Sequence, residues 1–147
     1  MKIILLLLLL LLPAPSFSQG IYDLSCDNVS RIRIVRIEAE HWNVRSDKGH
    51  FHAVHFHLKP NMTEEFSKLV NLAHSIFIDR KGVGHVGNKL ILTANGTPLR
   101  NDAPELEGLG NDGVAIVITR EQDAFDTARA VCPALVPRKV LIDGQWE

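Results

Sequence analysis

The stretch His50–Pro60 constrains the fold of this chain more than any other. Val54, Phe56 and Leu58 place apolar side chains on one face of an extended segment. The opposite face is mainly polar and carries Ala53, His55, His57 and Lys59. Alternation with a period of two residues is typical of a strand with one buried face. Pro60 has no N–H to donate to a neighbouring strand, so we expect the strand to end there.

A helix is predicted directly after this strand. Asn61 is a favoured N-cap residue, and Glu64 lies three residues later, where a capping box places its acid. Apolar side chains then recur at helical spacing, at Met62, Phe66, Leu69, Val70 and Ala73. The helix is expected to reach at least Ala73. Two alternatives remain beyond it: continuation to Ile78, or a separate strand over residues 75–79.

The first eighteen residues have the pattern of a secretory signal peptide. Lys2 precedes the apolar run Ile3–Leu12, and the small residues after it predict cleavage after Ser18. The run is shorter than the roughly 20 apolar residues that span a bilayer, and no later segment is apolar enough. We therefore expect one globular domain over residues 19–147, periplasmic or secreted, with no transmembrane segment after removal of the signal.

Cys26 and Cys132 are the two cysteines of the chain. An even number in an exported protein favours one disulfide bond. A bond that closes a loop of about 100 residues stabilises a fold by about 4–5 kcal/mol in the chain-entropy model. The alternative is a pair of free thiols that act in catalysis or metal binding, but no CxxC spacing supports it.

The rest of the chain predicts more strands and a second helix. After an irregular lead-in over residues 21–29, strands are expected at Ser30–Glu40, Lys89–Ala94, Val114–Ile118 and Lys139–Ile142. In the first of these the apolar face switches in mid-run, which indicates a bulge or a strand covered on both sides. Asn95-Gly96 is a strong signal for a hairpin turn. Thr119, with Gln122 three residues later, is expected to cap the second helix, which Pro133 ends.

These elements predict an α+β fold: an antiparallel or mixed β-sheet with two α-helices packed on one face. The net charge of −1 and the absence of long runs of one sign argue against a nucleic-acid-binding protein. Arg31, Arg33 and Arg36 fall on one strand. We expect solvated arginines there rather than a binding patch.

His55 and His57 are the most suggestive residues for ligand chemistry. They lie two residues apart on one strand face, so both imidazoles can reach one metal ion. Other imidazoles come from the opposite face or from loops, at His50, His52, His41 and His85. A polar strand face without a ligand is the favoured interpretation, because histidine spacing alone is weak evidence for a metal site.

No catalytic residue and no cofactor are predicted. Ser67, His74 and Ser75 offer residue types suited to hydrolysis, but no GxSxG frame surrounds either serine. The acidic loop Asp102–Asp112 lacks the DxDxDG register of a calcium-binding EF-hand.

Several packing and turn motifs are shared with one known family. They are Val54-x-Phe56-x-Leu58-x-Pro60, Phe66, Gly87-x-x-Leu90, the Asn95-Gly96 turn and the final capped helix. With these motifs the chain resembles the head subdomain of the first periplasmic domain of SecD, a protein-export subunit, over roughly Ala53–Val131. The resemblance implies a SecD-head-like α+β fold, an envelope location and a non-catalytic contact role.

A protein or peptide of the cell envelope is the partner that this resemblance implies, and it carries over no catalytic residue. The alternative function is that of a periplasmic metal-binding protein that uses His55 and His57.

Overall fold

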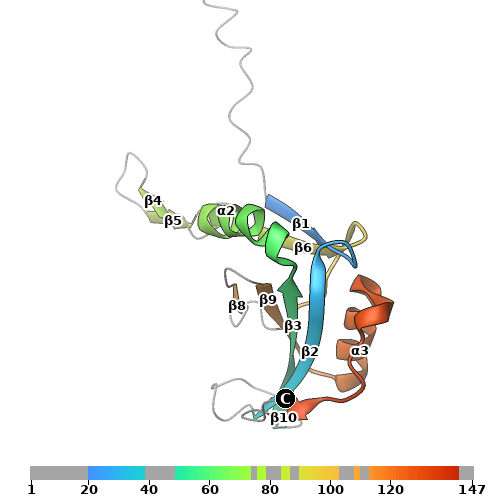
Figure 1. Ribbon diagram of the computed structural model, residues 1–147. Coiled ribbons are helices and arrows are strands. Elements are labelled where there is room, and N and C mark those ends of the chain that lie inside the picture. The colour runs from blue at the N-terminus through green and yellow to red at the C-terminus, as the bar shows by residue number, and fades with distance from the viewer. Residues whose placement is uncertain are drawn as a thin grey trace, which may run out of the picture.

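The computed structural model describes residues 20–38, 49–73, 76–78, 84–86, 90–102, 108–109 and 113–142. These residues form an α+β fold, which confirms the predicted class (Figure 1). The strands are β1 (Gly20–Leu24), β2 (Val29–Glu38), β3 (His50–Leu58), β4 (Ile76–Ile78), β5 (Gly84–Val86), β6 (Leu90–Ala94), β7 (Thr97–Pro98), β8 (Gly108–Leu109), β9 (Gly113–Ile118) and β10 (Leu141–Ile142). The helices are α2 (Thr63–Ala73) and α3 (Glu121–Val131), and 3-10 turns occur at η2 (Pro60–Met62) and η4 (Pro133–Leu135).

The larger sheet is mixed, and β3 is its central strand. Its strand order is β10-β2-β3-β9-β8. Strands β2 and β9 run antiparallel to β3, whereas β10 runs parallel to β2. The alternation predicted for β3 is confirmed, because Val54, Phe56 and Leu58 are buried while His55 and His57 are partly exposed.

Strand β2 is irregular near its start. Its register against β3 shifts between Val29 and Arg31, so the irregularity lies earlier than the expected mid-run bulge. Ile32 and Ile34 are buried in the core. Val35 faces the other side, where it is partly buried and pairs with β10. The switch of apolar face therefore reflects partial cover on both sides of the strand.

The smaller sheet has the order β1-β6-β7. The expectation of an irregular lead-in was wrong for residues 21–24, because β1 pairs in parallel with β6, a partner distant in sequence that no local pattern reveals. The hairpin between β6 and β7 is confirmed. Ala94 pairs with Thr97, and Asn95 and Gly96 both have positive φ, 50° and 81°, as a type I′ turn requires.

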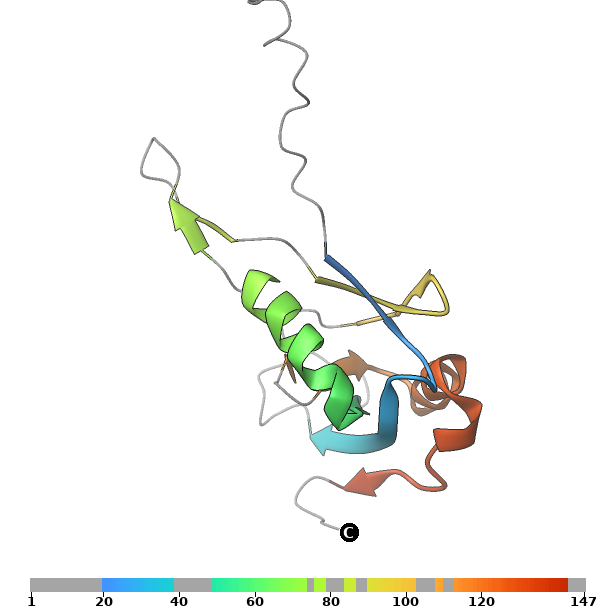
Figure 2. The ribbon, with the colours of Figure 1, turned by 45° about the horizontal axis from the view of Figure 1, so that its top comes forward.

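The segment after α2 is a strand, which decides between the two alternatives for its structure. Helix α2 ends at Ala73, and Ile76–Ile78 form β4, which pairs with β5. Figures 1 and 2 show this pair beyond the C-terminal end of α2, away from the two sheets.

One hydrophobic core joins both sheets and both helices. Helix α3 packs against β2, β3 and β9 of the larger sheet, whereas α2 packs against β1 and β6 of the smaller one. Phe66 of α2 meets Tyr22 of β1 edge to face, with ring centroids 4.9 Å apart. The helices thus contribute to a single core, but only α3 has the larger sheet as its main contact.

The predicted side-chain caps of both helices were wrong. A 3-10 turn precedes α2, so Asn61 lies inside that turn instead of capping the helix. The residue before α3 is Arg120, and it makes no side-chain capping bond. The hydroxyl of Thr119 instead donates to Asp102 Oδ2 at 2.9 Å. A partner from a preceding loop has displaced the local capping interaction.

The predicted disulfide bond is present. Cys26 and Cys132 are joined with their Cα atoms 4.9 Å apart. Cys26 lies in the turn between β1 and β2, where Asn28 Oδ1 accepts a hydrogen bond from the Ser25 N–H at 2.9 Å. Cys132 follows α3, and its N–H donates to the Ala128 carbonyl at 3.0 Å. The bond therefore fastens the end of α3 to the turn that leads into the larger sheet.

The part of the chain that the structure describes has no helix long and apolar enough to cross a membrane.

Candidate functional site

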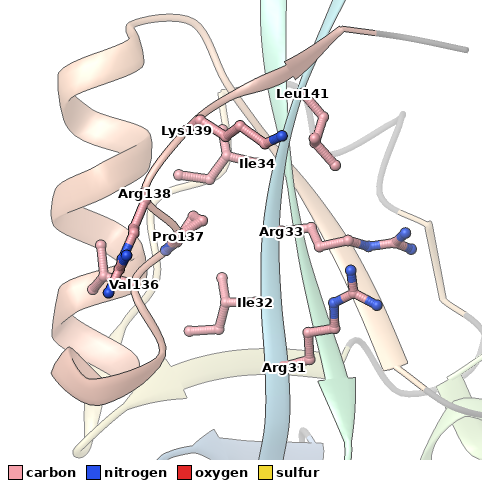
Figure 3. A pocket seen from close by; sticks show the side chains of 9 residues that line it. All are labelled: Arg31, Ile32, Arg33, Ile34, Val136, Pro137, Arg138, Lys139 and Leu141. Carbon is pink, nitrogen blue, oxygen red and sulfur yellow. The ribbon is translucent and has the colours of Figure 1, made fainter. Parts of the chain in front are cut away.

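A groove runs along the outer edge of β2. Strand β10 pairs with β2 only at Val35 and Arg36. Upstream of that pairing, residues 136–139 pass beside β2 without strand structure, and a hollow of about 470 Å³ lies between the two segments (Figure 3). Its lining residues are Arg31, Ile32, Arg33, Ile34, Val136, Pro137, Arg138, Lys139 and Leu141. This volume falls within the usual range of ligand sites.

The two sides of β2 give the groove two kinds of surface. Because successive side chains of a strand point to opposite faces, Ile32 and Ile34 leave on the α3 side, and Arg31 and Arg33 leave on the other (Figure 3). The residues on the α3 side add to the core: Ile34 is fully buried and Ile32 is 4% exposed. The groove therefore has an apolar side and a basic side along a single strand edge.

All charged residues of the groove are cations. Four of its nine lining residues are Arg31, Arg33, Arg138 and Lys139, and none is Asp or Glu. Clustered charges of one sign raise the local concentration of oppositely charged ligands. Anionic groups are therefore the chemistry that this groove favours.

Arg33 has an unused hydrogen-bond donor. Its Nε is buried and has no hydrogen-bond partner among the residues that the structure describes. A buried N–H without a partner is costly, and a ligand that supplies an acceptor removes that cost.

A second hollow of similar size shows how distinctive the charge of the groove is. It also measures about 470 Å³ and lies between the β6–β7 hairpin and α3. Its one cation, Arg100, bonds Asp123 Oδ2 at 2.8 Å, and Asp126 also lines it. This hollow therefore contains charges of both signs, whereas the lining of the groove contains only cations.

The histidines proposed as metal ligands lie beside the groove. His55 pairs across the strands with Arg33, and His57 pairs with Arg31. The two imidazole rings are stacked, with centroids 6.5 Å apart. Burial lowers the pKa of His55, and the neighbouring Arg33 and His57 lower it further. This face thus combines two imidazoles with two guanidinium groups, and the guanidinium groups repel a metal cation.

A third metal ligand is not seen with these two. No group of three or more His, Cys, Asp or Glu suited to a metal ion occurs among the described residues. His41 lies outside those residues, and His85 belongs to β5, whose backbone alone is described. The alternative of a metal site at His55 and His57 stays untested.

His52 lies on the opposite face of β3, as predicted. Its side chain is 1% exposed, and Nε2 lies 3.6 Å from Glu121 Oε2 at the start of α3. Burial lowers the pKa of His52, although the Glu121 carboxylate partly offsets this effect. The side chain belongs to the packing beneath α3 and takes no part in the groove.

The residue types considered for hydrolysis are not assembled by the described structure. Ser67 lies on α2, whereas His74 and Ser75 lie outside the described residues. In the acidic loop, Asp102 is occupied by Thr119, and residues 103–107 and 110–112 lie outside the described part.

Sequence reasoning missed the groove because its cations come from two distant segments. The sequence places Arg31 and Arg33 on one strand and predicts solvated side chains there. Arg138 and Lys139 line the same hollow because the segment that carries them leads into β10, which pairs in parallel with β2. The available signal was the pair Arg138-Lys139, whose lysine begins the predicted last strand.

Comparison of the chain with protein-family models, curated proteins and solved structures finds no match.

Proposed function

We propose that this chain is an exported, non-catalytic binding module that holds an anionic protein partner in the groove beside β2. The observation that carries the proposal is the groove itself, whose lining combines four cations with apolar side chains. Apolar surface supplies contact energy, and charge of one sign selects the partner.

The lining of the groove supports a role in binding rather than catalysis. Its side chains are aliphatic or proline residues together with arginine and lysine. Apart from Lys139, no residue type among them is a common nucleophile or general base. Positive charge and apolar contact are what this lining offers a ligand.

Export is supported by two features. The first eighteen residues have the pattern of a signal peptide, and the Cys26–Cys132 disulfide is compatible with an oxidising compartment. The resemblance to the SecD head favours the bacterial envelope as that compartment and a contact role within it. Intact-mass measurement on the exported fraction should give a chain that starts at Gln19. A chain that still starts at Met1 contradicts the export proposal.

Site-specific photocrosslinking in the producing cell tests the binding role. A benzophenone amino acid in place of Pro137, on the wall of the groove, should yield a discrete adduct, and Arg138→Glu should abolish it. Lys68→Glu is the matched control, because Lys68 is 71% exposed on α2, away from the groove lining. Absence of an adduct, or an adduct that persists in Arg138→Glu, contradicts the proposal.

A further inference from the structure

We propose that the ligand of the groove is an extended acidic peptide that adds as a strand to the outer edge of β2, upstream of β10. This inference rests on the proposed binding function and specifies the partner and its conformation. Strand addition to a sheet edge is a recurrent mode of peptide recognition, in which main-chain hydrogen bonds supply affinity and alternate side chains supply specificity.

The pairing of β2 leaves room for such a strand. Strand β2 has ten residues, and on its outer edge the described pairing involves only Val35 and Arg36. In its antiparallel pairing with β3, alternate residues direct their N–H and C=O groups away from β3, toward that edge. The N–H of Val29 already donates to the Ser25 carbonyl at 3.0 Å, so this part of the edge begins at Ser30. Residues 30–34 span about 17 Å at the rise of a β-strand, which accommodates a peptide of four or five residues.

The side chains of β2 predict the sequence pattern of the peptide. Neighbouring residues on paired strands lie on the same face of the sheet. An added strand therefore directs one set of its side chains to the α3 side of β2, where Val136 and Pro137 line the groove, and the alternate set to the side of Arg31 and Arg33 (Figure 3). The matching peptide alternates apolar and acidic residues.

The shape of the groove favours a peptide over other polyanions. The cations border one strand edge and an apolar side, with Ile32 and Ile34 buried beside it. A nucleic acid or an anionic membrane presents phosphate groups but no alternating apolar side chains that would use that side. An acidic peptide in extended conformation uses both.

Fluorescence anisotropy with a labelled peptide of alternating valine and glutamate tests the inference on the mature, oxidised protein. A peptide of the same composition, with its valines and glutamates in separate blocks, should bind about 10-fold more weakly. Arg33→Glu and Arg138→Glu should each weaken binding of the alternating peptide on the order of 10-fold, whereas Lys68→Glu should not. The second variant preserves the test if the partly buried Arg33 cannot be replaced without loss of folding.

Backbone N-methylation distinguishes strand addition from binding by charge alone. Two peptides carry methyl groups on alternate sets of backbone amides. Methylation of the amides that face β2 should abolish binding, whereas methylation of the other set should leave binding nearly unchanged. Equal effects of the two methylations, or none, overturn strand addition. So does equal affinity for the block peptide.

Other occupants of the edge give different results. Binding to phosphatidylglycerol vesicles that the alternating peptide does not displace assigns the basic side to a membrane and overturns the inference. A dimer in analytical ultracentrifugation that Arg138→Glu dissociates assigns the edge to a second copy of the chain, with the same consequence. An adduct at Pro137 without peptide binding leaves the proposed function standing and refutes only strand addition. Loss of both the adduct and the peptide binding refutes the proposed function together with strand addition.

Discussion

Asp102 and Thr119 are joined by two hydrogen bonds that end on the same carboxylate oxygen. Asp102 Oδ2 accepts from the backbone N–H of Thr119 at 2.8 Å and from its hydroxyl at 2.9 Å. Asp102 also bonds Arg100 through Oδ1 at 2.5 Å. The carboxylate therefore fixes the residue at which the chain leaves β9 and turns toward α3.

Replacement of Asp102 should destabilise the fold. The Asp102 side chain is 15% exposed, and Asp102→Ala leaves both donors of Thr119 without their acceptor. We expect a loss of about 2–3 kcal/mol in the free energy of unfolding, measured by urea denaturation. Asp126→Ala is the control, because Asp126 is 54% exposed and its ion pair with Arg129 lies on the helix surface. Its effect should stay within about 0.5 kcal/mol, and equal effects of the two variants would contradict the role of Asp102.

The hydrogen bonds between Asp102 and Thr119 should make the free energy of unfolding depend on pH. Burial raises the pKa of Asp102, but the hydrogen bonds from Thr119 and Arg100 outweigh this effect and hold it below the ordinary value of 3.8. A carboxylate with a lowered pKa in the folded state stabilises that state above 3.8, and this contribution is lost as the pH falls through the folded-state pKa.

Urea midpoints measured between about pH 6 and pH 2 test this dependence. Asp102→Asn should show a smaller decrease than the unchanged chain. Some acid sensitivity will remain, because hydrogen bonds from Thr93 and Gly96 also lower the pKa of Asp23. Identical pH profiles of the two chains would show that Asp102 contributes nothing to acid stability.

Local sequence patterns correctly predicted the elements whose conformation depends on neighbouring residues of the chain. The alternation around Val54 predicts strand β3 because burial of one face imposes a period of two. Asn95-Gly96 predicts its turn because both residues tolerate positive φ. The helix cap predicted at Thr119 was wrong because the partner of this residue comes from a different segment of the chain. Its sequence context fits a helix cap, but Asp102 competes for the same hydroxyl from an earlier segment.

The groove required a contact that no local pattern contains. Arg33 and Arg138 are more than a hundred residues apart in the sequence, and the short pairing of β10 with β2 brings them to one hollow. Two paired residues are too few to give a distinct sequence signal. Strand β1 was not predicted either, because the strand that it pairs with, β6, is distant in the sequence.

Two glycines should respond very differently to replacement by alanine. A Cβ on Gly113 would lie 2.1 Å from the carbonyl oxygen of Phe56, so Gly113→Ala must push β9 away from β3. We expect a loss of several kcal/mol or no folded protein. At Gly96 there is open space, and the cost of alanine comes only from φ of 81°, about 1–2 kcal/mol. Thermal unfolding compares the two, and a milder effect at Gly113 would contradict the close approach of the strands.

The disulfide should contribute to stability without determining the fold. Its cysteines are separated by 106 positions, and the chain-entropy model gives about 4–5 kcal/mol for a loop of this length, an upper figure. Reduction should therefore lower the unfolding temperature while the core still folds. Denatured, unreduced protein should expose no reactive thiol. Two thiols per chain would refute the bond between Cys26 and Cys132.

Metal titration decides between the proposed peptide partner and the alternative metal site. Calorimetry at neutral pH should show no sub-micromolar binding of Zn²⁺ or Cu²⁺, because His55 and His57 pair with Arg33 and Arg31, whose charges repel a cation. Replacement of both arginines by alanine should strengthen any weak binding. That binding should weaken toward pH 5, where protonation removes the lone pairs that the imidazoles offer to a metal. A sub-micromolar site in the unchanged chain that His55→Ala/His57→Ala abolishes would establish metal binding at this face and reverse the order of the two functions.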